Sequence, residues 1–133
     1  MSDQQPVIKC DSVYKIFGKN AEKMLQNANG KVVAEEFQKA GCVVGVNNAS
    51  FEVNKGEMLV VMGLSGSGKS TLLRCISRLT DATAGNIYID GEDLLALNSK
   101  ELIELRRNKM GMVFQSFALL PHKTVLENIA FPL

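Results

Sequence analysis

Gly63-Leu64-Ser65-Gly66-Ser67-Gly68-Lys69-Ser70-Thr71 is the stretch that decides the fold of this chain. It matches G-x-x-x-x-G-K-[ST], the pattern of a phosphate-binding P-loop. Before it, residues 57–62 form a short apolar run of the length of a buried strand. After it, apolar residues recur at the spacing of one helical face, at Leu72, Leu73, Ile76 and Leu79. The context therefore predicts a strand, a glycine-rich turn and a helix, which is the arrangement that a P-loop requires.

Each residue type in this stretch has a physical role in binding a nucleotide phosphate. Glycines permit backbone angles that are closed to other residues, so the loop N–H groups can turn inward and form an anion nest. Lys69 places a compact charge on the β- and γ-phosphates of ATP, and the Ser70 hydroxyl can ligate Mg²⁺. The alternative is a plain Gly/Ser turn with an exposed lysine. The predicted nucleotide-binding residues here are Gly63, Ser65, Gly66, Ser67, Gly68, Lys69, Ser70 and Thr71, the last for backbone or phosphate contacts.

A length of 133 residues allows one domain at most, and the composition is ordinary for a globular chain. The net charge of +1 is too small to create a strong electrostatic attraction to nucleic acid or to an anionic membrane surface, so no nucleic-acid partner is expected. Arg106, Arg107 and Lys109 cluster, and we interpret them as a solvated helix end. No apolar run reaches the roughly 18 residues of a membrane span, and the first residues do not resemble a signal peptide. The three cysteines have no metal or redox spacing, which predicts buried thiols in a reducing cytoplasm.

Working outward from the P-loop, the pattern alternates between strands and helices. Strands are predicted at residues 7–13, 43–53 and 86–90, and a further apolar strand at 111–115 ends in Gln115. Residues 19–41 carry two short amphipathic patterns, each ended by a glycine, which predict a helical hairpin between two strands. Capping boxes, Asn98 with Glu101 and Thr124 with Glu127, open two further helices.

Three stretches together resemble the ATP-binding subunit of an ABC transporter. They are the P-loop, residues 85–91 and residues 112–122, and the last is similar to the Q-loop of that family. The helical insertion at residues 19–41 and the form of the P-loop resemble those of the glycine betaine/proline (quaternary amine) importers. The resemblance implies an α/β fold: the N-terminal half of an ABC ATPase of the P-loop NTPase class. In it, an antiparallel β-subdomain lies beside a partial, mostly parallel core sheet with helices.

The resemblance also implies roles for residues outside the P-loop. Phe17 lies where the family keeps an aromatic that stacks on adenine, with Tyr14 as its rival and core packing as the alternative. Gln115 matches the glutamine that ligates Mg²⁺ or orients the attacking water; the alternative is a strand-end amide bonded to backbone. The region from Phe117 to Pro121 is expected to contact a transmembrane permease subunit, unless it packs in the core. We assign no catalytic role to His122.

The function implied is a homodimeric ATPase subunit that energises import of glycine betaine, proline or a related solute. It would act at the cytoplasmic face of the plasma membrane. The signature Leu-Ser-Gly-Gly-Gln, the second nucleotide motif with its glutamate, and the switch histidine are absent from these 133 residues. We therefore interpret the chain as a fragment that is inactive alone. The alternatives are a fragment that binds nucleotide or a membrane subunit without turnover, and a different P-loop NTPase such as a kinase or GTPase.

Overall fold

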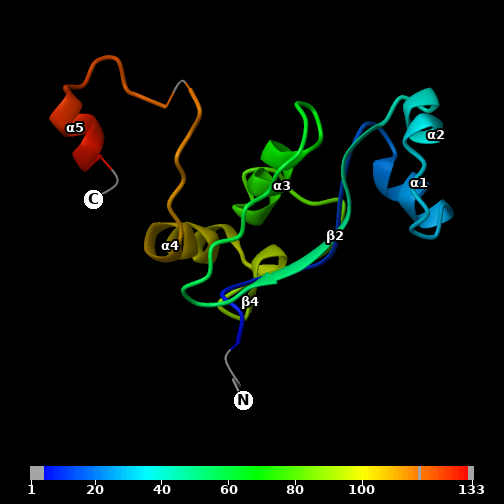
Figure 1. The fold of residues 1–133 in the computed structure, drawn as a ribbon, viewed down its shortest axis with the longest axis horizontal. Helices are drawn as coiled ribbons and strands as arrows, with labels where there is room; N and C mark the ends of the chain where they lie inside the picture. Colours follow the sequence, from blue (N-terminus) through cyan, green and yellow to red (C-terminus); the bar gives the residue numbers. More distant parts are fainter. Residues whose placement is uncertain (1–4, 117, 132–133) are drawn as a thin grey trace.

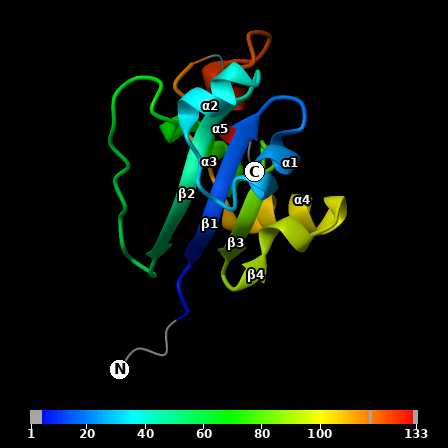
Figure 2. The ribbon, with the colours of Figure 1, turned by 90° about the vertical axis from the view of Figure 1, so that its right-hand side faces the viewer.

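A four-stranded antiparallel sheet forms the centre of the protein (Figure 2). The structure, a computed structural model, describes residues 5–116 and 118–131. The strands lie in the order β2-β1-β3-β4. Their bounds are Ile8–Phe17 for β1, Val43–Val53 for β2, Ala84–Ile89 for β3 and Glu92–Asp93 for β4. The strands predicted at residues 43–53 and 86–90 are confirmed, and β1 continues four residues past its predicted end because Lys15–Phe17 pair with β2.

Strand β1 contributes side chains to two separate hydrophobic clusters. Its pairing register shifts between Cys10 and Val13, so both of these side chains face the cluster that contains Leu72 and Cys75. Farther along, Tyr14 and Ile16 face a second cluster. The strand therefore links the two halves of the hydrophobic core.

The helical hairpin predicted for residues 19–41 is present as α1, Ala21–Asn27, and α2, Ala34–Lys39, at one end of the molecule (Figure 1). Ala21 and Leu25 of α1 are buried with Phe37 of α2 against the second cluster of β1. Val33, which was expected on the buried face of α2, is 47% exposed, because it lies at the N-cap rather than within the helix.

Helix α3, Lys69–Ile76, follows the P-loop and packs on the sheet through Leu72 and Cys75. Leu73 and Leu79 are about half exposed, at 49% and 52%, so the expectation that they share the buried face is wrong. A 3-10 turn, η1 at Leu94–Ala96, leads to α4, Ser99–Lys109, whose predicted capping box is confirmed.

Two predicted strands are not formed in the part of the chain that the structure describes. Residues 57–62 and 111–115 run as extended segments outside the sheet. Their apolar side chains are exposed, with Met58 at 89%, Val60 at 67% and Val113 at 99%. A strand of a parallel sheet needs hydrogen-bonded neighbours and cover on both faces, and neither segment pairs with a strand here. The α/β class and the antiparallel subdomain are confirmed, whereas the expected parallel strands are not.

The last helix, α5 at Val125–Ala130, lies beyond an extended segment and apart from the sheet (Figure 1). Its predicted capping box, Thr124 with Glu127, is present. The Asn128 side chain fixes the preceding loop, since its amide nitrogen donates to the carbonyls of Leu120, Lys123 and Thr124 at 2.9–3.2 Å. Among the described residues, no helix is both long and apolar enough to span a bilayer.

Candidate nucleotide-binding site

The P-loop turns sharply into α3, and its glycines carry the turn. Gly66 and Gly68 have φ values of 82° and 99°, in the left-handed region that other residues rarely adopt. The Leu72 N–H donates to the Gly68 carbonyl at 2.9 Å, so the helix begins directly after the loop. Gly63 is also constrained, because a Cβ at this position would lie 2.5 Å from the Ser67 hydroxyl oxygen.

Lys69 is the cationic centre of this loop. Its ammonium donates to the carbonyl oxygens of Gly63 and Leu64, both at 2.7 Å, and to the Ser67 hydroxyl at 3.2 Å. An ammonium has three N–H donors, so these contacts use all of them and place the charge inside the curve of the loop. The positive charge and the N-terminus of α3 therefore lie together, as an anion site requires.

Gly45 of β2 joins the sheet to the start of α3. Lys15 pairs with Val46 and Ile16 pairs with Val44, so Gly45 is the extra residue of a β-bulge. A Cβ on Gly68 would overlap the Gly45 carbonyl oxygen, which shows how closely the two backbones approach. Sequence analysis missed Gly45. The available signal was an isolated glycine between valines in a predicted strand, which is typical of a bulge or of a close backbone approach.

Phe17 lies at the same junction as the end of the P-loop. A Cβ placed on Gly45 would be 2.9 Å from Phe17 Cε2 and 3.0 Å from the Thr71 methyl carbon, so both side chains flank Gly45. The Phe17 side chain is 43% exposed. Tyr14, the rival for the stacking role, is only 9% exposed, and its hydroxyl donates to the Gly30 carbonyl at 3.4 Å. Tyr14 is therefore packed in the core and does not offer an open ring face to a base.

The remaining predicted site residues are placed differently. Ser70 is exposed on the first turn of α3, whereas the Thr71 methyl group packs toward Gly45. Gln115 is exposed in a bend after the extended segment, and among the described residues no hydrogen bond joins it to Lys69 or Ser70. The structure brings the P-loop and Phe17 together but does not bring Gln115 to them.

The expected permease contact lies only partly within the described residues. Phe117 is outside them, while Leu119 is 77% exposed. Leu119, Leu120 and Pro121 line an open groove of about 330 Å³ together with Val125 and Ile129 of α5. The groove is apolar and faces solvent in this structure.

The three cysteines are buried as predicted. Burial is the main cause that raises the pKa of the Cys10 thiol to about 11, and the nearby Cys75 raises it further. In the described part of the chain, no group of three or more His, Cys, Asp or Glu side chains is arranged to hold a metal ion. Mg²⁺ commonly binds through one or two protein oxygens together with substrate phosphates, and the Ser70 hydroxyl is a suitable donor of this kind.

Comparison with known proteins gives the family. The model of the family described as "ABC transporter" matches residues 46–131. The chain is 84% identical over all its 133 residues to the trimethylamine N-oxide transport system ATP-binding protein of Pelagibacter ubique, of which it covers 38%. It is 53% identical over 98% of its length to the glycine betaine transport ATP-binding protein of Bacillus subtilis, of which it covers 32%.

A solved structure shows the same fold. It is the dimeric post-hydrolysis state of an ATP-binding cassette bound to ADP and phosphate, with a TM-score of 0.73 and 34% identity. The match covers 94% of this chain and 46% of that one. The fold and the P-loop define a nucleotide-binding cassette. The chain belongs to the ABC transporter family and spans about a third of the length of the curated relatives it matches.

Proposed function

We propose that this chain is part of an ATP-binding subunit whose ATPase activity drives import of a methylated-amine compatible solute. The observation that carries the proposal is the position of the Lys69 ammonium inside the P-loop at the start of α3. A phosphate chain bound there would accept the N–H hydrogen bonds that the Lys69 ammonium now donates to the loop carbonyls. It would also meet the N-terminal N–H groups of α3.

Mg²⁺ would bind between the protein and the phosphates of ATP. Ser70, exposed on the first turn of α3, supplies one oxygen, and we assign the second protein oxygen to the Gln115 amide. Gln115 lies in a bend after an extended segment, so it would have to move toward the P-loop when nucleotide binds. The ion supplies charge neutralisation for phosphoryl transfer, while Lys69 and the loop N–H groups position the phosphates.

Phe17 is proposed as the platform for the base. Its ring is partly exposed and lies beside Gly45 of β2, whose carbonyl closely approaches Gly68 at the start of α3. Stacking uses only the π-face of a base, so we expect GTP to compete with ATP within about tenfold.

The relatives that this chain resembles support the solute class and the partners. They are a trimethylamine N-oxide transport system ATP-binding protein at 84% identity and a glycine betaine transport ATP-binding protein at 53%. Both solutes are methylated amines, which supports the quaternary-amine class. A transporter subunit of this kind would contact a membrane permease through the groove at Leu119 to Ile129, at the cytoplasmic face of the plasma membrane. The dimeric cassette structure supports assembly as a homodimer.

Titration with a fluorescent ATP analogue in the presence of Mg²⁺ tests this function. Lys69→Ala removes the charge inside the loop and should weaken binding by tenfold or more, about 1.4 kcal/mol. Lys55→Ala is the matched control, because Lys55 is an exposed lysine in the turn before the P-loop segment. Equal titration of all three proteins would show that the P-loop of this chain is not a nucleotide site.

A further inference from the structure

Lys15 and Phe17 form a cation–π pair at the edge of the proposed base site. The Lys15 ammonium lies 5.0 Å from the centroid of the Phe17 ring. The two residues are separated by one position in β1, so their side chains emerge on the same side of the strand. The Phe17 ring is therefore contacted by a cation from its own strand.

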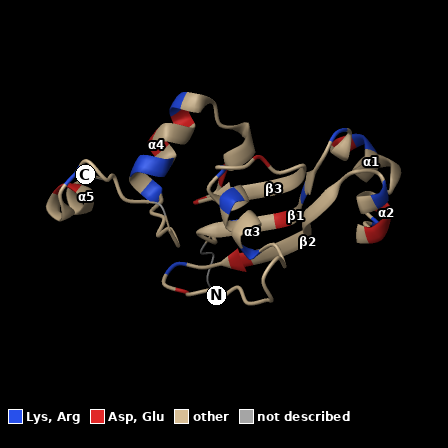
Figure 3. Cartoon of the chain, turned by 90° about the horizontal axis from the view of Figure 1, so that it is seen from above, with Lys and Arg blue, Asp and Glu red and all other residues tan. Residues whose placement is uncertain are grey.

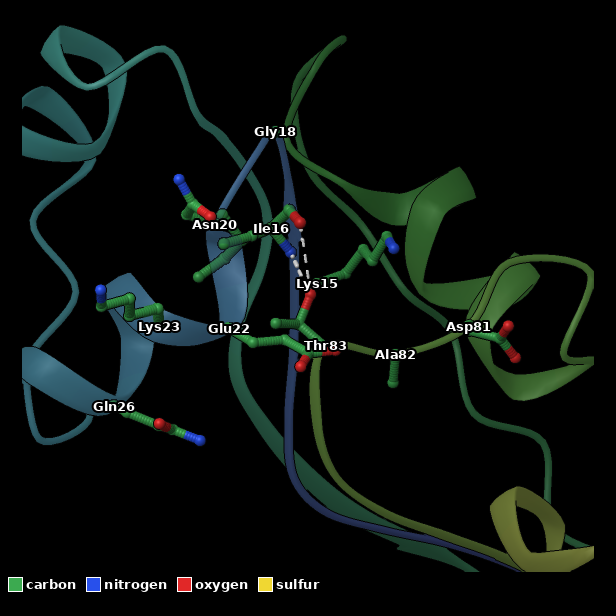
Figure 4. Close-up of a pocket in the computed structure, with 11 residues that line it drawn as sticks. Lys15, Ile16, Gly18, Asn20, Glu22, Lys23, Gln26, Asp81, Ala82 and Thr83 are labelled. Carbon is green, nitrogen blue, oxygen red and sulfur yellow. Dashed lines mark hydrogen bonds between the residues drawn. The ribbon is translucent and has the colours of Figure 1, made fainter.

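The surroundings of Lys15 direct its charge toward α3. In Figure 4 its side chain extends from β1 away from Glu22 and Lys23, toward the ribbon of α3. Burial raises the pKa of the Cys75 thiol in α3, and the positive charge of Lys15 acts in the opposite direction. In the described part of the chain no carboxylate forms a salt bridge with Lys15, whereas the Lys9 ammonium on the same strand pairs with Glu52. The aromatic ring is thus the principal partner of this half-buried cation.

We propose that Lys15 is a positioning residue of the base site, which holds the Phe17 ring in one orientation and leaves its other face for the base. The inference rests on the proposed function, in which Phe17 stacks on the nucleotide. A cation on one face withdraws electron density from the ring and limits its rotation. An electron-rich purine then meets an ordered, polarised surface on the opposite face.

This role predicts an effect on the base and none on the phosphates. A cation–π contact of this kind corresponds to a change of about threefold in a binding constant. Lys15→Met removes the charge and keeps the length of the side chain, so it should weaken ATP binding about threefold. Binding of inorganic triphosphate, which has no base, should stay unchanged. Lys15→Arg keeps a cation on the ring and should retain the affinity of the wild type.

The experiment measures ATP and inorganic triphosphate binding, with Mg²⁺, by calorimetry on the 133-residue chain. The variants are Lys15→Met, Lys15→Arg, Phe17→Leu and the double variant Lys15→Met/Phe17→Leu. Lys23→Met is the control for loss of a surface charge, since Lys23 and Lys15 line one groove and the Lys23 side chain extends away from Lys15 (Figure 4). Lys15→Met should cause no further loss of ATP affinity in the Phe17→Leu background.

Equal losses for ATP and triphosphate would overturn the inference, and so would tighter ATP binding by Lys15→Met or a full loss of ATP affinity from Lys15→Met in the Phe17→Leu background. The first would mean that Lys15 contacts phosphate, and the second that it blocks the ring. Unchanged ATP binding by Lys15→Met, with Lys69→Ala still defective, would overturn this inference and leave the proposed function intact. Binding that is insensitive to Lys69→Ala would remove both. If Lys15→Met does not fold, as judged by circular dichroism, Lys15→Gln replaces it and the same criteria apply.

Discussion

At the scale of single residues, the site depends on a close approach of two glycines. Gly68 ends the P-loop with a positive φ, and its Cα faces the carbonyl of Gly45 in the bulge of β2. A side chain on either residue would separate the sheet from the start of α3. The sequence identifies Gly68 through its motif, but it contains no sign that Gly45 is the partner.

Gly45→Ala should disrupt this junction. Its new Cβ would lie 2.9 Å from Phe17 Cε2 and 3.0 Å from the Thr71 methyl carbon, so at least one of them must move. We expect overpacking to lower the free energy of unfolding by about 1–3 kcal/mol and ATP affinity to fall with it. Urea unfolding and ATP titration measure the two effects.

Gly111→Ala is the control for this substitution, because a Cβ at Gly111 meets no atom within 4 Å. Its free energy of unfolding should stay within about 0.5 kcal/mol of the wild type. If Gly45→Ala is as stable and binds ATP as well as Gly111→Ala, the proposed junction does not constrain the site.

At the scale of elements, Arg106 connects α4 to the end of α3. Its guanidinium donates through Nε to the Ser77 carbonyl at 3.1 Å and through Nη2 to the Arg78 carbonyl at 2.7 Å. The interpretation of the basic cluster as a solvated helix end is therefore wrong for Arg106, although Arg107 beside it is exposed. Figure 3 shows the basic residues that gather on α4. Lys109 also has a partner, since its ammonium lies 2.9 Å from Asp90, which raises its pKa.

Arg106→Met should destabilise the packing of α4 on α3. It leaves two carbonyl oxygens at the C-terminal end of α3 without their charged donor, and such hydrogen bonds contribute about 1.5–3 kcal/mol. Arg107→Met is the matched control, because among the residues that the structure describes Arg107 makes only a 3.5 Å salt bridge with Glu104 at the surface. Exposed pairs of this kind contribute about 0–1 kcal/mol. Equal unfolding midpoints for the two variants in urea would contradict the structural role of Arg106.

At the scale of the whole molecule, an antiparallel sheet carries the P-loop helix α3 on one face, and the helical hairpin lies at one end of the molecule (Figures 1 and 2). The 133 residues contain the P-loop and no Leu-Ser-Gly-Gly-Gln sequence. Phosphoryl transfer needs positioned phosphates, Mg²⁺ and an oriented water. In the proposed site the P-loop would position the first, whereas the structure does not bring Gln115 to the P-loop.

We expect the 133-residue chain alone to bind ATP without sustained hydrolysis. Removing groups that stabilise the transition state typically lowers rates by several powers of ten, and binding does not depend on them. Phosphate release, measured against Lys69→Ala as the background, tests this. A turnover on the order of 1 s⁻¹ that is lost in Lys69→Ala would be typical of a working enzyme and would refute the expectation.

The sequence by itself determined the features whose physical causes lie within a few neighbouring residues. The capping boxes at Asn98 and Thr124 open their helices as predicted, because each is made by side chains three positions apart. The P-loop turn follows from glycines that alone tolerate its backbone angles. The three strands of the antiparallel subdomain and the helical hairpin follow from short hydrophobic periods.

Tertiary structure alone decided which distant segments meet. Gly45 lies against Gly68, the Lys15 side chain extends toward α3, and Arg106 reaches the end of α3; no local pattern specifies any of these contacts. Residues 57–62 also show that composition does not decide pairing. Their apolar run has the composition of a buried strand, but such a run becomes a strand only where neighbouring strands pair with it. Hydrophobic patterning fixes what a segment can do, and long-range pairing and packing decide whether it does so.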